Sequence, residues 1–135
     1  MLVASKLTDY SELHQAVDII NDSGYYAPVT VFDLERVSMY GMKSAGIIIA
    51  CAMVIYMGDR GYLDYLCVKP QLQGQGYAVR LLDFIAQDMA TLGVRRIHAC
   101  VNGTNEVASK LALRYHAKVG FPYLNILVNL EENHG

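Results

Sequence analysis

Long apolar runs are absent from this 135-residue chain. The longest, from Ala45 to Met57, is well short of the roughly 20 apolar residues that a membrane-spanning helix needs, and it is typical of a buried strand. The chain also begins without a charged segment followed by an apolar stretch, so we expect no secretory signal. The sequence therefore predicts a protein with no membrane partner.

Clustered positive charge is equally scarce. The chain has 11 Lys and Arg residues against 13 Asp and Glu residues, which gives a formal net charge of −2. The pair Arg95-Arg96 is too small a cluster to indicate binding of a phosphate backbone. We therefore expect no nucleic-acid partner.

Cysteine and histidine are few and widely spaced. No two cysteines have Cys-x-x-Cys spacing, and the histidines show no metal-ligand spacing. The cysteines are Cys51, Cys67 and Cys100, and the histidines are His14, His98, His116 and His134. All three cysteines fall in predicted strands, and buried, unpaired thiols are typical of a reducing compartment. The sequence thus predicts a cytoplasmic protein without a metal site.

Apolar residues, by contrast, are plentiful at 53% of the chain. The length is close to the commonest size of a single domain and is sufficient for a substantial core. We therefore expect one domain over residues 1–135.

The most informative segment runs from residue 62 to residue 92. Residues Tyr62 to Val68 favour a strand, which Pro70 should end near Lys69 because proline has no N–H to donate. A helix is predicted from Gly76 to Leu92, since apolar residues recur there at steps of three and four. These residues are Ala78, Leu81, Leu82, Ile85, Ala86, Met89 and Leu92.

The loop between this strand and this helix is a candidate anion site. The first N–H groups of a helix have no internal partner and the helix dipole adds positive charge there, while glycines allow close approach of an anion. The fingerprint of dinucleotide-binding proteins would need a glycine where Val79 stands. A P-loop would need Gly-Lys-Ser/Thr at the start of the helix. The loop fits neither pattern.

What remains is Gln-x-x-Gly-x-Gly at Gln71, Gly74 and Gly76, after a strand that ends Cys-Val-Lys-Pro. This segment resembles the loop of the GCN5-related N-acetyltransferase (GNAT) family, whose pattern is Arg/Gln-x-x-Gly-x-Gly/Ala. The resemblance extends over residues 44 to 121 and includes Val101-Asn102, Asn105 and Gly120-Phe121. It implies an α/β fold of mixed, α+β-like type: a mostly antiparallel central sheet with a splayed pair of parallel strands, flanked by helices.

The order of elements predicted from the sequence agrees with that fold. A first helix should begin at Thr8 or Asp9 and bury Tyr10, Leu13, Ala16, Val17 and Ile20, and Asp33 to Tyr40 could form either a helix or a strand. The remaining predicted elements are strands at Leu2–Lys6, Gly46–Met57, Tyr62–Val68, Val94–Val101 and Tyr123–Leu130, with a last helix at Asn105–Lys118. The strand Val94–Val101 should lie parallel to Tyr62–Val68 because a helical crossover joins them.

The resemblance also implies which residues hold the cofactor, acetyl-CoA. Backbone groups of Leu66, Cys67 and Val68 would contact the thioester arm, and one N–H there would stabilise the oxyanion. The loop residues implied for the pyrophosphate are Gln71, Gln73, Gly74, Gln75, Gly76, Tyr77 and Ala78. Asn105, or Ser109 if the usual spacing holds, would contact the cofactor from the last helix. The Cys67 side chain itself should be a small buried group.

Three residues are candidates for acid–base catalysis. Asp64 is the only acidic residue of its strand, and it would need burial to act as a base near neutral pH. The family's acid is a tyrosine four residues before the glycine of Gly-Phe, which here is His116, with Tyr115 one residue earlier. Either Tyr115 or His116 could therefore be the acid.

Taken together, the sequence predicts an acetyl-CoA-dependent N-acetyltransferase that acetylates a primary amine directly in a ternary complex. The acceptor could be a small molecule or a peptide. The resemblance implies that the segment Tyr25–Met42, with Tyr25 and Tyr26, shapes the acceptor site; alternatively, the two tyrosines only cover the core. The alternative is a non-catalytic acyl-CoA-binding or sensor domain of the same fold. Few residues follow Phe121, so the sheet edge could be completed by a second copy of the chain, as a homodimer.

Overall fold

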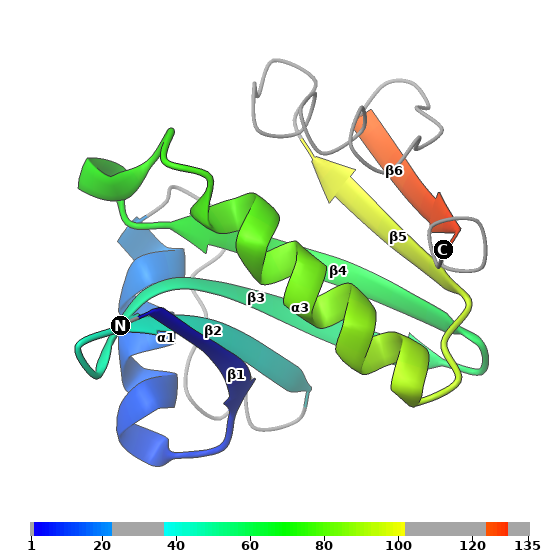
Figure 1. The fold of residues 1–135 in the computed structure, drawn as a ribbon, viewed down its shortest axis with the longest axis horizontal. Helices are drawn as coiled ribbons and strands as arrows, with labels where there is room; N and C mark the ends of the chain where they lie inside the picture. Colours follow the sequence, from blue (N-terminus) through cyan, green and yellow to red (C-terminus); the bar gives the residue numbers. More distant parts are fainter. Residues whose placement is uncertain (1, 23–36, 102–123, 130–135) are drawn as a thin grey trace. The chain divides into compact units, whose positions relative to one another are not determined.

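The computed structural model describes residues 2–22, 37–101 and 124–129 (Figure 1). Its elements are β1 (Leu2–Leu7), α1 (Tyr10–Asp22), β2 (Ser38–Ser44), β3 (Ile47–Met57), β4 (Arg60–Val68), the 3-10 helix η1 (Pro70–Leu72), α3 (Tyr77–Thr91), β5 (Arg96–Val101) and β6 (Leu124–Asn129). The five predicted strands and the first two predicted helices are confirmed. Ser38–Ser44 is a strand, so the end of the segment Asp33 to Tyr40, for which a helix and a strand were both possible, belongs to a strand. The predicted helix Asn105–Lys118 and residues 25–36 lie outside the described ranges.

The strands are hydrogen-bonded in the order β1-β2-β3-β4-β5-β6. The pairs β1–β2, β2–β3 and β5–β6 are antiparallel, and β4–β5 is parallel, as the crossover predicted. The parallel pairing runs from Arg60 opposite Arg96 to Leu63 opposite Ala99, and β4 continues beyond it to Val68. The sheet is mixed, and its parallel strands β4 and β5 are paired over only part of their length. This arrangement confirms the predicted fold class.

The chain divides into two compact units, each described here by itself. The first comprises Met1–Val54 and Tyr65–Phe84, and the second comprises Ile55–Asp64 and Ile85–Gly135. In the second unit, the Asp59 carbonyl accepts N–H bonds from Arg95 (2.7 Å) and Arg96 (3.3 Å), which fixes the β3–β4 turn to the start of β5. The second unit buries Leu63, Ile85, Ala86, Met89, Val94 and Ile97.

In the first unit, helices cover both faces of the sheet (Figure 1). One face buries Leu7, Leu13, Ala16, Ile19, Ile20, Met39, Ile48, Cys51 and Cys67 in a single cluster around α1. The other face carries Tyr40, whose ring meets Phe84 of α3 edge-on at 6.1 Å. Neighbouring residues of a strand point to opposite faces, so Met39 of β2 packs on the side of α1 and Tyr40 packs on the side of α3.

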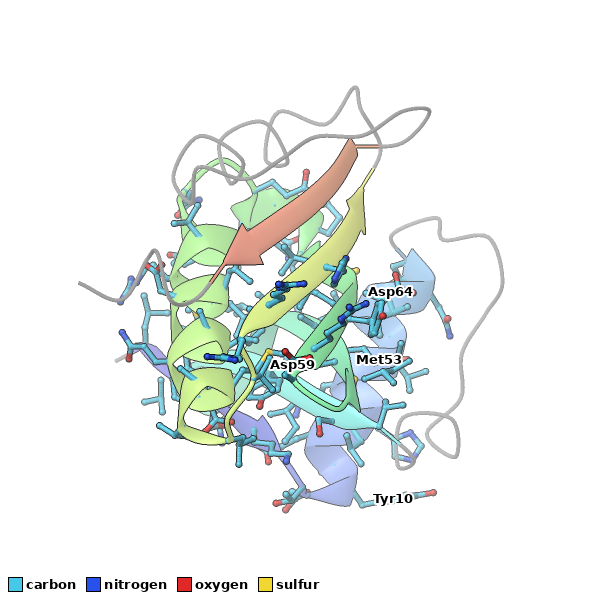
Figure 2. All side chains as sticks on the ribbon, turned by 90° about the vertical axis from the view of Figure 1, so that its right-hand side faces the viewer. Tyr10, Met53, Asp59 and Asp64 are labelled. Atoms are coloured by element: carbon cyan, nitrogen blue, oxygen red, sulfur yellow. The ribbon has the colours of Figure 1, made fainter. Side chains whose placement is uncertain are left out.

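Helix α1 begins as predicted and is held to the sheet by polar contacts. The Asp9 carboxylate accepts the Ser11 N–H at 2.7 Å, which caps the helix. Glu12 forms an ion pair with Lys43, and the Gln15 side chain accepts the Ile48 N–H at 2.9 Å. The prediction that Tyr10 is buried was wrong. Tyr10 occupies the first helical position, is 61% exposed and packs edge-on against His14 (Figure 2).

Helix α3 buries the predicted apolar stripe from Ala78 to Met89. It ends at a glycine turn in which the N–H of Gly93 (φ +86°) bonds to Ala90 O and the N–H of Val94 bonds to Met89 O. These two bonds satisfy carbonyls that the last helical turn leaves open. Leu92 lies past the last helical residue and is 58% exposed, so its predicted place in the buried stripe was wrong. Neither described helix is long and apolar enough to cross a membrane.

Candidate functional site

The end of β4 is fixed by a bulge in the neighbouring strand β3. Between Met42 opposite Ala50 and Lys43 opposite Ile48, residue Ile49 is an extra residue in β3. Its carbonyl accepts the N–H of Lys69 at 2.9 Å. Pro70 then opens η1, and the Leu72 N–H returns to the Lys69 carbonyl at 2.9 Å. The predicted end of the strand near Lys69 is therefore confirmed, and its position depends on a β-bulge.

The loop after η1 is closed by a glutamine side chain. The Gln73 Nε2 amide donates to the carbonyl of Val68 at 3.2 Å, and the Gln73 N–H donates to the Pro70 carbonyl at 3.4 Å. The predicted role of Gln73 was cofactor contact. In the structure its amide joins the loop to the last residue of β4, so Gln73 shapes the loop from within.

Two glycines give this loop an open backbone. Gly74 has φ +80° and Gly76 has φ +83°, and a Cβ added at either position would meet nothing within 4 Å. The backbone turns through a conformation that side-chain-bearing residues rarely adopt. A ligand can therefore approach this backbone without meeting a side chain of residue 74 or 76.

The loop leads directly into the N-terminus of α3. The first intrahelical bond runs from the Arg80 N–H to the Gly76 carbonyl at 3.1 Å, so the N–H groups of Tyr77, Ala78 and Val79 precede any intrahelical acceptor. These groups, the helix dipole and the open glycine backbone together suit an anionic group such as a pyrophosphate. The residues present thus fit coenzyme A.

The cofactor pattern also occurs in a second register, two residues further on. Gln73, Gly76 and Ala78 satisfy Arg/Gln-x-x-Gly-x-Gly/Ala as well as Gln71, Gly74 and Gly76 do. In the second register the central glycine is Gly76, whose carbonyl accepts the first hydrogen bond of α3. The glutamine is Gln73, whose side chain closes the loop. The overlap is visible in the sequence, but only the start of α3 at Tyr77 shows which glycine adjoins the helix.

The other loop residues differ in exposure. Gln71 and Gln75 are exposed, Tyr77 is partly buried, and Ala78 is buried at the start of the apolar stripe. Arg80, one turn into the helix, is exposed. Ala78 can therefore contribute its N–H to an anion, while its methyl group packs into the core.

At the end of β4, Leu66 is partly buried and Cys67 and Val68 are buried. The Cys67 side chain belongs to the apolar cluster beneath α1, as predicted, and it contacts Cys51. The hydrogen bond between the Cys51 and Cys67 side chains, followed by burial, raises the pKa of the Cys51 thiol well above its ordinary value. Neither of these two cysteines forms a disulfide. Because a neutral buried thiol is unreactive, neither is a candidate nucleophile.

The candidate base, Asp64, lies on β4 in the second unit and is exposed (Figure 2). The burial that would suit a carboxylate to this role near neutral pH is therefore not observed. Two positions along the same strand, the Tyr62 ring stacks on the imidazole of His98, with centroids 5.2 Å apart and planes 19° apart. Nothing in the sequence singles out His98, because its proximity to Tyr62 depends on the β4–β5 register.

The remaining predicted site residues, Asn105, Ser109, Tyr115 and His116, fall in residues 102–123, and the predicted acceptor tyrosines Tyr25 and Tyr26 fall in residues 23–36. Both ranges are outside the part of the chain that the structure describes. Their roles stay predictions. Within the described ranges, no three His, Cys, Asp or Glu side chains are grouped so that they could hold a metal ion.

Comparison with known proteins supports the cofactor interpretation of this loop. The model of the Acetyltransferase (GNAT) family matches residues 7–121, which include β4, the glycine loop and α3. No curated protein matches the chain in sequence at a significant level.

Solved structures with the same fold are numerous. The ribosomal-protein-S18-alanine N-acetyltransferase of Escherichia coli superposes with a TM-score of 0.76 at 20% identity, over 94% of this chain and 91% of the other. PaiA N-acetyltransferase of Thermoplasma acidophilum, solved with coenzyme A, gives 0.76 at 13% identity, over 96% and 99%. N-acetylglutamate synthase of Neisseria gonorrhoeae, solved with coenzyme A and L-arginine, gives 0.77 at 17% identity, over 95% of this chain and 33% of the other.

Proposed function

The chain belongs to the GNAT acetyltransferase family, and on that premise we propose that it transfers an acetyl group directly to a primary amine in a ternary complex. It is an enzyme that uses acetyl-CoA as the acetyl donor, as members of this family do. The acceptor that we propose is a small molecule or a peptide. The single observation that carries the cofactor part is the open backbone at Gly74 and Gly76, directly before the unpaired N–H groups of α3.

We propose that the loop from Gln71 to Ala78 holds the pyrophosphate of the cofactor. Its chain contributes N–H groups at Tyr77, Ala78 and Val79, and Gln73 keeps the loop closed against Val68. When bound, acetyl-CoA supplies the thioester that the amine attacks. By the family resemblance, backbone groups of Leu66, Cys67 and Val68 would hold the thioester arm, with one N–H directed at the oxyanion.

For proton transfer, the proposal keeps the candidates that the family pattern selects. Asp64 would accept a proton from the amine, and Tyr115 or His116 would donate one to the leaving thiolate. Asn105 would contact the cofactor. If Tyr115→Phe and His116→Gln each retain full turnover, neither residue is the acid. A loss of about tenfold or more in kcat for one variant alone would assign it.

The names of related enzymes indicate which classes of acceptor this fold can take. One structural relative is named for the alanine of a ribosomal protein and another for glutamate, so the fold accommodates peptide and small-molecule amines alike. The chain's net charge of −2 and its lack of a basic cluster favour acceptors other than nucleic acids. The buried thiols of Cys51 and Cys67, which form no disulfide, support a reducing, cytoplasmic location.

The test of the proposed function is release of free coenzyme A thiol from acetyl-CoA in the presence of amines. The panel should contain a polyamine, an aminoglycoside, free amino acids and short peptides with free N-termini. We expect amine-dependent thiol release with at least one class and an acetylated product one acetyl group heavier by mass spectrometry. Binding of coenzyme A without transfer to any class would contradict the proposal.

We also propose that a second copy of the chain can pair with an edge strand of the sheet. In the described sheet the edge strands are β1 and β6, and an open edge has backbone groups available for pairing. Light scattering at the working concentration tests this. A dimer mass is expected, and a monomer mass would exclude the pairing.

A further inference from the structure

A β-bulge in β3 leaves one backbone donor of the first unit to be satisfied by a side chain. Ile49 is the extra residue of this strand, so Ile48 and Ile49 together take the place of one residue in the pairing with β2. A bulge of this kind interrupts the regular ladder of hydrogen bonds between strands. At this point the Ile48 N–H donates to Oε1 of the Gln15 side chain at 2.9 Å.

The side chain of Gln15 reaches the bulge from the face of the sheet that α1 covers, opposite to α3 (Figure 1). Gln15 is partly buried, and Ile48 is completely buried. A buried N–H without an acceptor is unfavourable, because it has lost its hydrogen bonds to water. An apolar side chain at position 15 would therefore leave the Ile48 N–H without this acceptor.

The same bulge holds the end of β4. The Ile49 carbonyl accepts the Lys69 N–H at 2.9 Å. Only the φ and ψ torsions of Ile48 and Ile49 lie between this carbonyl and the N–H that Gln15 binds. Because peptide groups are planar and these torsions are the soft ones, a contact that holds the Ile48 N–H also restricts the direction of the Ile49 carbonyl.

From Lys69 the connection continues into the loop from Gln71 to Ala78, the proposed cofactor loop. The Lys69 carbonyl accepts the Leu72 N–H at 2.9 Å, and the Val68 carbonyl accepts the Gln73 Nε2 amide at 3.2 Å. Every group in this connection, from α1 to the start of α3, belongs to the first compact unit. The strand end and the loop are thus joined to α1 by successive hydrogen bonds.

We propose that Gln15 is a positioning residue for acetyl-CoA, which acts through the bulge of β3 on the proposed cofactor loop. Its oxygen holds Ile48, the bulge holds Lys69, and Lys69 sets where the loop begins. Donor groups that are already in place bind a ligand more tightly, because the ligand does not have to order them. This role of Gln15 rests on the proposed function, since the loop is taken to hold the pyrophosphate, and it requires no contact between Gln15 and the cofactor.

The test compares two substitutions of Gln15. Gln15→Met keeps an unbranched side chain and a good helix former but removes the acceptor, whereas Gln15→Glu keeps an accepting oxygen. Isothermal titration calorimetry measures the Kd for coenzyme A at a temperature at which both variants are folded. We expect Gln15→Met to raise this Kd about fivefold, and Gln15→Glu to stay within about twofold of the wild-type protein.

A matched control is Asp9→Ala, which removes the cap of the same helix and keeps Gln15. It should lower the unfolding free energy and leave the Kd for coenzyme A within about twofold. If Asp9→Ala weakens binding as much as Gln15→Met does, the Gln15 contact serves stability alone and the proposal is wrong. The proposal is also wrong if Gln15→Glu binds as weakly as Gln15→Met, since the accepting oxygen would then have no effect.

Turnover gives a second measurement. In acetyl transfer, Gln15→Met should raise the KM for acetyl-CoA by the same factor as the Kd and change kcat by less than about twofold. A lower kcat with an unchanged KM would contradict a role in positioning the cofactor.

If Gln15→Met does not fold, amide hydrogen exchange of the wild-type protein decides. Coupling between two sites is reciprocal, so coenzyme A should slow the exchange of the Ile48 N–H as well as that of the Lys69 N–H. The Ser11 N–H, in the first turn of α1, should change by less than about twofold. Slower exchange at Lys69 with no change at Ile48 would overturn the proposal.

The wild-type protein separates the two levels of the proposal. If it binds no coenzyme A, the proposed function fails, and the role of Gln15 fails with it. If it binds coenzyme A and a folded Gln15→Met variant has a Kd within about twofold of the wild-type value, only the role of Gln15 fails.

Discussion

At the scale of single residues, the proposed cofactor loop, from Gln71 to Ala78, depends on two backbone conformations. Gly74 and Gly76 combine positive φ angles with open space where a Cβ would stand. A side chain there would have two separate effects, strain in the backbone and obstruction of a bound anion. Gly58, in the β3–β4 turn, also has a positive φ (+61°) and open space around it, so it reproduces the strain without the obstruction.

We predict that Gly76→Ala weakens coenzyme A binding by about tenfold or more, while Gly58→Ala does not. Both variants should lose about 1–2 kcal/mol of stability, because an L-residue is disfavoured in this region of φ. Isothermal titration calorimetry and denaturant unfolding measure the two effects. Equal affinity in the two variants would show that the glycine loop does not hold the anion.

Cys51 is a second residue whose environment predicts a measurable effect. Its hydrogen bond with the Cys67 side chain, and burial, raise the pKa of its thiol in the folded state. In the unfolded chain the thiol ionises near its ordinary pKa of about 8.5, so above that pH the folded state binds more protons than the unfolded state. Stability from this group is therefore complete below about pH 8.5 and decreases as pH rises, by at most about 1.4 kcal/mol per pH unit.

The corresponding prediction is that Cys51→Ala flattens the dependence of stability on alkaline pH. Urea unfolding in reducing buffer should show a steeper loss of unfolding free energy for the wild-type protein than for Cys51→Ala between about pH 8.5 and about pH 10. Cys51→Ala will also have a lower stability at neutral pH because it leaves a small cavity. Parallel pH dependences would contradict the raised pKa.

At the scale of elements, α1 and the β-bulge of β3 form one polar connection. The Gln15 side chain accepts the Ile48 N–H on one side of the bulge, and the Ile49 carbonyl accepts the Lys69 N–H from the end of β4. A helix near the N-terminus is thus linked, through a single bulge, to the strand end that precedes the proposed cofactor loop. A substitution that destabilises α1 should therefore lower the unfolding free energy of the protein more than it changes the conformation of this loop.

Removing the cap of α1 tests this element. We predict that Asp9→Ala lowers the unfolding free energy by about 1 kcal/mol, since the Ser11 N–H loses its acceptor. Asp18→Ala, an exposed position in the same helix, serves as the control and should cost much less. Denaturant unfolding of the two variants gives the comparison. Equal losses would show that the Asp9 contact contributes nothing specific.

At the scale of the whole molecule, ligand binding should stabilise the fold. A cofactor that binds only the folded chain contributes about 2.7 kcal/mol at 100 times its Kd. We predict a corresponding rise in the thermal midpoint with acetyl-CoA in the wild-type protein and in Gly58→Ala, and a smaller rise in Gly76→Ala at the same concentration. The absence of any rise in the wild-type protein would contradict cofactor binding. That residues 1–135 act as a single domain remains a prediction.

Much of this architecture could be predicted from local sequence. The strand that ends before Pro70, the helix stripe from Ala78 to Met89 and the glycine turn at Gly93 follow from rules that act over a few residues. The errors, Tyr10 and Leu92, both lie at helix ends, where the apolar period still matches but the side chain no longer faces the sheet. For β3, continuous apolarity correctly predicted a buried centre, while Ile47 and Ile55 near its ends are exposed.

The sequence by itself determined the glycine-containing turn between β4 and α3, because glycines, a proline and a helix start act on adjacent backbone atoms. Only the tertiary structure could place the Ile49 carbonyl against Lys69 or Cys51 against Cys67, since those contacts depend on the pairing between strands. It alone paired His98 with Tyr62, residues far apart in sequence that the β4–β5 register makes direct neighbours. Contacts of this kind depend on strand order and register, which side-chain periodicity within one strand does not specify.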